Sequence, residues 1–65
     1  MKITVNGEPK NVSSDNLAAL LAELQFELEL VATAVNQSFV RAKDRAATHL
    51  QPGDQVEILT PRQGG

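Results

Sequence analysis

The chain opens with apolar residues at every second position: Met1, Ile3 and Val5. A two-residue period predicts a β-strand with one buried face. Asn6 and Gly7 follow, and both tolerate the positive φ angles that a tight hairpin turn needs. The pattern therefore predicts a hairpin whose second strand covers residues 8–12. Pro9 cannot donate a ladder hydrogen bond, which favours an edge position for that strand.

A helix is expected next, beginning at about Leu17. Residues 13–16 read Ser-Ser-Asp-Asn, and each side chain can accept a hydrogen bond from an N–H group of a first helical turn. Leucines then recur at the spacing of one helical face: Leu17, Leu20, Leu21 and Leu24. A chain this short needs its leucines in the core, so we interpret the stripe as buried rather than as a partner-binding groove.

The second half of the chain predicts three more strands, at residues 31–35, 39–40 and 55–60. Residues 25–30 form a connector, residues 36–38 and 51–54 have turn composition, and residues 41–49 are polar and irregular or briefly helical. Alternation in the first of these strands places Ala32 and Ala34 on the face opposite to Val31, Thr33 and Val35. In the last strand Val56 and Ile58 point inward, and Glu57 and Leu59 point outward.

The order strand, strand, helix, strand, short strand, strand predicts an α+β fold of the β-grasp type. The first and last strands then pair in parallel in the middle of a mixed four- to five-stranded sheet, which packs on one main helix. We expect one domain over residues 1–60, followed by a flexible C-terminal tail at residues 61–65.

Length and composition limit the possible functions. Sixty-five residues suffice for one domain with a thin core, which leaves little chain to enclose a catalytic pocket. No cysteine is present, so thiolate chemistry and disulfides are excluded. A net charge of −2 without a concentrated basic face argues against nucleic acid as a partner. No apolar run approaches a membrane span or a signal peptide, so we expect a cytoplasmic protein.

Candidate catalytic residues are few. His49 is the sole histidine, and its nearest acidic residues, Asp44 and Asp54, lie five positions away on either side, which matches no standard zinc-site spacing. Ser13 and Ser14 are better explained as helix caps than as nucleophiles. We therefore expect no metal, no bound cofactor and no enzymatic activity of the chain itself.

The unusual chemistry lies in the tail, which reads Pro61-Arg62-Gln63-Gly64-Gly65. Two residues without side chains can enter a narrow channel where a larger residue would clash. A main-chain carboxylate is ionised at neutral pH and is a poor electrophile. It must therefore be activated before it can acylate anything, and adenylation by ATP supplies the leaving group.

The sequence resembles the ThiS family of ubiquitin-like sulfur carriers of thiamin biosynthesis over nearly its whole length. The segments that carry the resemblance are residues 1–8, 17–24, 31–36 and 53–58 and the terminal Gly64-Gly65. Many family members have a Val-Pro-Arg turn and a tryptophan where this chain has residues 40–45. Each segment is loose by itself, but their order and spacing are specific.

The resemblance implies a carrier cycle that depends on partner enzymes. An E1-like adenylating enzyme of the ThiF type uses MgATP to adenylate the carboxylate of Gly65. Sulfur from a cysteine desulfurase persulfide then displaces AMP, and the resulting thiocarboxylate donates sulfur to a thiazole synthase of the ThiG type.

The resemblance also implies roles for particular residues. Gly65 bears the reacting group, Gly64 gives it access, and Arg62 and Gln63 contact the channel of the partner. Three outward residues would form a small apolar docking patch: Ala32, Ala34 and Leu59. The free chain is expected to be a monomer.

Two alternatives stay open at this point. The same chemistry could serve another pathway, as in the MoaD carriers of molybdopterin synthesis, although these are usually some fifteen residues longer. The chain could also be a β-grasp module that binds a partner without covalent chemistry, in which case it should tolerate a C-terminal extension.

Overall fold

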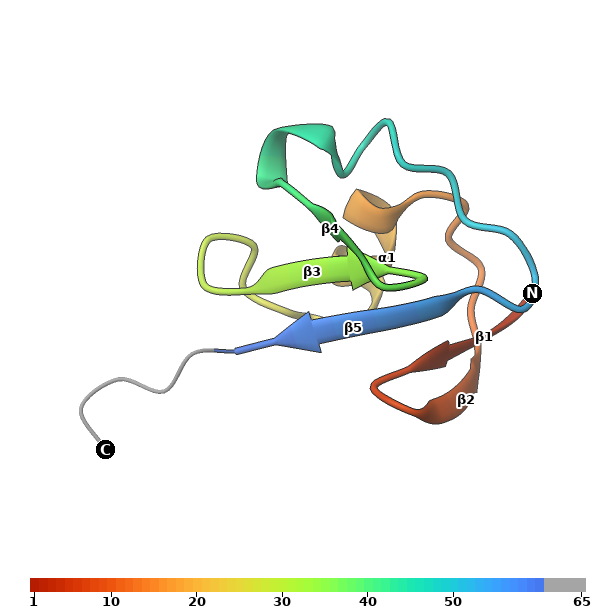
Figure 1. The fold of residues 1–65 in the computed structure, drawn as a ribbon. Helices are drawn as coiled ribbons and strands as arrows, with labels where there is room; N and C mark the ends of the chain where they lie inside the picture. Colours follow the sequence, from red (N-terminus) through yellow and green to blue (C-terminus); the bar gives the residue numbers. More distant parts are fainter. Residues whose placement is uncertain (61–65) are drawn as a thin grey trace.

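Five strands and one α-helix make up the fold in the computed structural model, which describes residues 1–60 (Figure 1). In chain order the elements are β1 (Lys2–Val5), β2 (Glu8–Asn11), α1 (Leu17–Glu23), β3 (Ala32–Val35), β4 (Ser38–Val40), a 3₁₀ turn η1 (Ala42–Asp44) and β5 (Gln55–Leu59). Every element that the sequence predicted is present. The last strand ends at Leu59, one residue earlier than expected.

The sheet has the order β2-β1-β5-β3-β4, so β5 lies in the middle and β2 lies at an edge. β1 and β5 pair in parallel, with Thr4 opposite Gln55 and Val5 opposite Val56, whereas the other neighbours are antiparallel. This is the β-grasp, ubiquitin-like arrangement that the order of elements predicted. Because β5 is central, its C-terminal end leaves the sheet between β1 and β3 (Figure 1).

Both hairpins turn through two consecutive residues with positive φ. These are Asn6 (52°) and Gly7 (83°) in the first hairpin, and Asn36 (51°) and Gln37 (72°) in the second. Two positive φ angles match the right-handed twist of the flanking strands, and asparagine is among the residues that adopt them most readily. The second turn is therefore one residue shorter than the predicted turn at 36–38, and Ser38 already belongs to β4.

Asn16 caps α1 by accepting a hydrogen bond from the backbone N–H of Ala19 at 2.8 Å. Ser13 and Ser14 do not cap this helix, contrary to our expectation. Their backbone N–H groups and the Ser14 hydroxyl donate to the carboxylate of Glu23 in the last turn. The Ser14 hydroxyl, followed by the Ser13 N–H, lowers the pKa of Glu23 because both groups stabilise the charged form.

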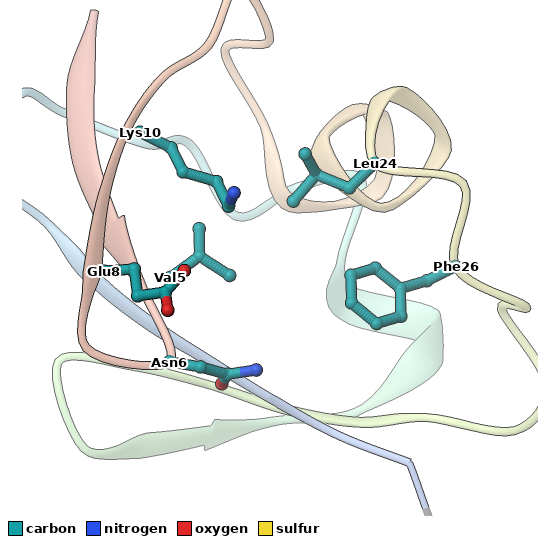
Figure 2. A pocket seen from close by; sticks show the side chains of 6 residues that line it. All are labelled: Val5, Asn6, Glu8, Lys10, Leu24 and Phe26. Carbon is teal, nitrogen blue, oxygen red and sulfur yellow. The ribbon is translucent and has the colours of Figure 1, made fainter.

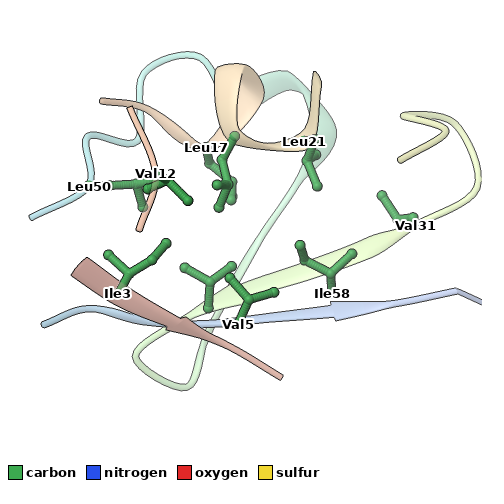
Figure 3. Packing of buried hydrophobic residues seen from close by; sticks show 10 residues of the cluster. Ile3, Val5, Val12, Leu17, Leu21, Val31, Leu50 and Ile58 are labelled. Atoms are coloured by element: carbon green, nitrogen blue, oxygen red, sulfur yellow. The ribbon is translucent and has the colours of Figure 1, made fainter. Parts of the chain in front are cut away.

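The core lies between α1 and one face of the sheet (Figure 3). Leu17, Leu20 and Leu21 are fully buried, which confirms the leucine stripe as a core face. Opposite them lie the inward side chains of the two central parallel strands: Ile3, Val5, Val56 and Ile58. α1 covers only this face, so the opposite face of the sheet is free of any helix within residues 1–60.

The predicted tail at residues 61–65 lies outside the described residues, so the division into domain and tail stays a prediction. Within residues 1–60 no helix is long and apolar enough to cross a membrane.

Candidate functional site

Four apolar side chains meet on the helix-free face of the sheet, and we call them the apolar patch: Ala32, Ala34, Phe39 and Leu59. They come from three adjacent strands. The ladder places Ala32 opposite Leu59 and Ala34 opposite Phe39. Phe39 is 70% exposed and Leu59 is 66% exposed, which makes them the most exposed large apolar residues of residues 1–60.

The patch is shallow. It surrounds a depression of about 70 Å³ that Glu57 borders on one side. A surface of this shape can receive an apolar side chain of a partner protein, but it is too small to enclose a substrate. The arrangement therefore favours docking over catalysis.

Ala32, Ala34 and Leu59 lie together as the sequence predicted, whereas Phe39 was missed. The two-residue turn at Asn36 and Gln37 pairs Val35 with Ser38, which in turn sets Phe39 beside Ala34 on the outer face. A one-residue change of register would reverse that orientation. The asparagine in the turn was the available signal, because it favours the two-residue form over the three-residue form that we predicted.

The patch lies where β5 ends. Leu59 is the last residue of the strand, and Thr60 is the last residue that the structure describes. The remaining predicted site residues lie outside the described range: Arg62, Gln63, Gly64 and Gly65. Their roles stay predictions, and the described part of the candidate site is the apolar patch at the end of β5.

Arg45 stabilises the loop that precedes β3, and no sequence pattern predicted this role. Its side chain is only 5% exposed. The guanidinium donates to the carbonyl of Leu28 at 2.9 Å, to the carbonyl of Val31 at 2.7 Å and to the Thr33 hydroxyl at 3.2 Å. These contacts connect the segment after η1 to the loop that leads into β3, and Ala32 of the apolar patch directly follows that loop.

A second hollow, of about 380 Å³, lies on the helix side of the sheet between β2 and the end of α1 (Figure 2). Val5, Leu24 and Phe26 form its apolar part, and Glu8 and Lys10 line it from the edge strand. Its lining contains no serine, histidine or cysteine, and its charged groups, Glu8 and Lys10, both come from the exposed edge strand β2.

The lone histidine is exposed, as expected. His49 forms an isolated backbone bridge with Asn16. Residues 1–60 contain no group of three histidine, cysteine, aspartate or glutamate side chains that could hold a metal ion.

Comparison with known families agrees with the fold. The family model named ThiS family matches residues 3–65. This chain belongs to the ThiS family. The match covers nearly the whole sequence and includes the residues beyond β5.

Individual relatives match over nearly their full length. The sulfur carrier protein ThiS of Thermus thermophilus is 32% identical, covering 97% of this chain and 98% of that protein. An uncharacterized protein, ycf40, of Porphyra purpurea is 35% identical over all of this chain and 93% of its own length.

Solved structures show the same fold. The crystal structure of the thiamine biosynthesis protein (ThiS) from Geobacter metallireducens has a TM-score of 0.86 and 33% identity, covering the whole of both chains. An NMR structure of a thiamine biosynthesis protein from the same organism gives a TM-score of 0.83 at 33% identity, covering all of this chain and 88% of that one.

Proposed function

We propose that this chain is a sulfur carrier of thiamin biosynthesis, acted on by partner enzymes, whose Gly65 carboxylate becomes a thiocarboxylate. The observation that carries the proposal is the ThiS family match over residues 3–65, which includes both terminal glycines. The carrier name of the Thermus thermophilus relative supports it. The absence of a catalytic constellation from residues 1–60 is consistent with a carrier, because the partners then supply the chemistry.

The chemistry proceeds by two displacements and one reduction. The Gly65 carboxylate attacks the α-phosphorus of MgATP on an E1-like adenylating enzyme and releases pyrophosphate. A persulfide sulfur from a cysteine desulfurase attacks the acyl carbon and expels AMP, which leaves an acyl disulfide. A thiol reductant then cleaves the sulfur–sulfur bond, releasing the thiocarboxylate and a mixed disulfide. Pyrophosphate leaves in the first displacement and AMP in the second, whereas the free carboxylate has no good leaving group.

The apolar patch provides the docking surface for the adenylating enzyme in this proposal. Phe39 and Leu59 are large and exposed, and the small Ala32 and Ala34 between them leave room for a partner's side chain. Burying exposed apolar area on association is favourable, and aromatic residues are enriched at the centres of such interfaces. Docking through the apolar patch also brings the C-terminal end of β5 against the enzyme, since Leu59 belongs both to the patch and to the end of the strand.

The first test measures the intact mass of the chain after incubation with an E1-like adenylating enzyme, MgATP, a cysteine desulfurase, cysteine and a thiol reductant. Replacing one oxygen by sulfur adds about 16 mass units by acyl substitution. We expect that gain with the full chain and none when MgATP is omitted or Gly65 is deleted. The deletion should unfold at the same urea concentration as the full chain, because the core residues of the described fold all lie between Ile3 and Ile58.

Failure of the full chain to gain mass with several activating enzymes would contradict the proposal and favour a non-covalent β-grasp binding module. A gain that persists after deletion of Gly65 would place the reaction elsewhere on the chain.

The pathway requires a second measurement, because MoaD-type carriers share the thiocarboxylate chemistry. The loaded chain should transfer sulfur to a thiazole synthase of the ThiG type, with loss of the added mass. Transfer to a molybdopterin synthase instead would keep the carrier chemistry and overturn the thiamin assignment.

A further inference from the structure

The side chain of Asn6 holds the C-terminal end of β5. Its Oδ1 accepts a hydrogen bond from the backbone N–H of Ile58 at 2.8 Å, and its Nδ2 donates to the carbonyl of Ile58 at 3.1 Å. The backbone N–H of Asn6 also donates to the carbonyl of Val56 at 2.9 Å. One residue of the first hairpin turn therefore makes three hydrogen bonds to the last strand.

The geometry follows from where β1 ends. β1 pairs with β5 as far as Val5 opposite Val56, and the positive φ of Asn6 then turns the backbone away from β5. In a strand alternate residues direct their N–H and C=O groups to the same side, so Ile58 is the next residue that faces β1. An amide side chain offers one donor and one acceptor, as a peptide group does. The Asn6 amide thus takes the place of the missing next peptide of β1.

The turn by itself does not require this side chain. Glycine and aspartate also suit the first position of a two-residue turn with positive φ. Of the three residues, only asparagine can accept from the Ile58 N–H and donate to the Ile58 carbonyl at the same time. The amide is therefore explained by the contact with β5 rather than by the turn.

Asn36 provides a natural comparison, because it occupies the same position in the second turn. Its Oδ1 accepts from the N–H of Gln55 at 2.9 Å, and its Nδ2 donates to the Asp54 carboxylate at 3.0 Å. The two asparagines therefore hold opposite ends of β5: Asn36 the beginning and Asn6 the end. Only the end held by Asn6 leads toward the C-terminal glycines.

We propose that Asn6 is a positioning residue for the loading reaction, which fixes the point at which β5 leaves the sheet on its way to the adenylating centre. This inference rests on the proposed carrier function. With the amide in place, Ile58 stays in the sheet and Leu59 stays in the apolar patch. Without it, β5 has no partner on its β1 side beyond Val56 within residues 1–60. The last residues of the strand are then held by β3 alone, where Ala32 pairs with Leu59 and Thr33 with Ile58.

The consequence for the reaction concerns geometry rather than affinity. A reacting group that starts from a fixed point reaches its target more often than one carried on a longer loose segment, and a misplacement of about 1 Å can cost as much as 100-fold in rate. The pairing of β3 with β4 and of Ala32 with Leu59 does not depend on Asn6, so the patch and docking itself should persist. Asn6 should therefore influence kcat more than KM.

Three variants test the proposal: Asn6→Gly, Asn6→Asp and Asn36→Gly. The glycine variants keep each turn and remove each amide, and Asn6→Asp keeps the acceptor but places a carboxylate oxygen against the Ile58 carbonyl. The first readout is amide hydrogen exchange of the free chain, which needs no partner. We expect exchange at Ile58 to be about 5- to 10-fold faster in Asn6→Gly, where the Ile58 N–H loses its acceptor, and less affected in Asn6→Asp, which keeps an acceptor. Exchange at Gln55 should respond only in Asn36→Gly.

The second readout is the steady-state rate of thiocarboxylate formation, measured well below the unfolding temperature of each variant. We expect kcat to fall about 10-fold or more in the two Asn6 variants with KM within about 2-fold of the unsubstituted chain, and neither constant to change in Asn36→Gly. A purely structural role would lower stability in both glycine variants and leave kcat unchanged.

The outcomes separate the two proposals. If the unsubstituted chain loads but Asn6→Gly and Asn6→Asp load with the same kcat, the positioning role is wrong and the carrier function stands. Unchanged exchange at Ile58 in Asn6→Gly would likewise contradict the positioning role. If the unsubstituted chain gains no mass, the carrier function falls, and the positioning role falls with it.

Discussion

Arg45 combines a full positive charge with almost complete burial. Its guanidinium donates to two carbonyls of the loop before β3 and to the Thr33 hydroxyl, and that hydroxyl donates in turn to the carbonyl of Val40. The one ion pair within residues 1–60 joins Arg41 and Asp44, so in this part of the chain the charge of Arg45 is stabilised by neutral acceptors. A planar group with five donors suits several carbonyls at fixed positions better than an ammonium group does.

Substitution of Arg45 therefore tests a buried side chain that makes three hydrogen bonds. We expect Arg45→Met to lower the free energy of unfolding by about 3 kcal/mol, because buried acceptors lose their donor and each such loss costs about 1–3 kcal/mol. Arg45→Lys should lose less, since it keeps the charge and part of the hydrogen bonding. Urea denaturation measures both values, with Arg41→Met as the matched exposed control. Equal stability of Arg45→Met and Arg41→Met would contradict the role assigned to Arg45.

At the scale of the elements, β5 connects the fold to the proposed chemistry. Its inward residues, Val56 and Ile58, belong to the core, and its outward Leu59 belongs to the apolar patch. It pairs with β1 on one side and with β3 on the other, and the asparagines of the two hairpin turns hold its ends. One five-residue strand thus fixes the docking face and the exit of the chain together.

The docking role of this strand is tested by Leu59→Gln, with Leu28→Gln as the control. Leu28 is also exposed, at 48%, but it lies in the loop before β3 and outside the patch. We expect Leu59→Gln to raise KM for the adenylating enzyme about 5- to 10-fold, which corresponds to an interface contact worth somewhat more than 1 kcal/mol. Stability should change by less than about 0.5 kcal/mol, because the residue is exposed.

Steady-state kinetics with the adenylating enzyme gives KM for both variants. Leu28→Gln should behave as the unsubstituted chain does, and equal effects of the two substitutions would show that the patch is not the docking surface. A rise in KM for Leu59→Gln also contrasts with the fall in kcat expected for Asn6→Gly. The two experiments therefore separate docking from positioning.

At the scale of the whole molecule, one helix and one face of a sheet supply most of the buried core, and Val12, Val31 and Leu50 from the connecting segments complete it. A domain of this size buries only about 60% of the surface that its unfolded chain exposes. The core accordingly depends on a few side chains, of which Leu20 is fully buried at the centre of α1. Each of these side chains contributes a large share of the total stability.

Leu20→Ala measures that dependence. We expect the free energy of unfolding to fall by about 2–5 kcal/mol, the usual cost of removing a buried leucine side chain, and this is a large part of the roughly 5–15 kcal/mol typical of small proteins. Leu28→Ala, which removes the same atoms from an exposed position, should change stability by less than about 0.5 kcal/mol. Urea denaturation followed by circular dichroism distinguishes the two, and a similar loss in both would contradict this description of the core.

Local sequence patterns were enough to predict the order and type of the elements and the inner and outer faces of the strands. They also identified the ThiS family through short segments and the terminal glycines. These features depend on neighbours in sequence: a period of two for a strand, a stripe of leucines for a helix, a cap before the first turn. The helix face and the outward positions of Ala32, Ala34 and Leu59 were predictable for that reason.

Three features depend on tertiary packing and could not be predicted from local sequence: the burial of Arg45, the outward position of Phe39 and the contact of Asn6 with Ile58. The Asn6 contact joins residues 52 positions apart, and Arg45 reaches acceptors 12 to 17 positions away. No local pattern distinguishes Arg45 from Arg41, or the amide of Asn6 from any other asparagine in a turn. The hydrogen bonds of Asn6 and Arg45 form only when separate elements pack together. Their acceptors and donors include backbone groups that the strands and loops themselves leave unpaired.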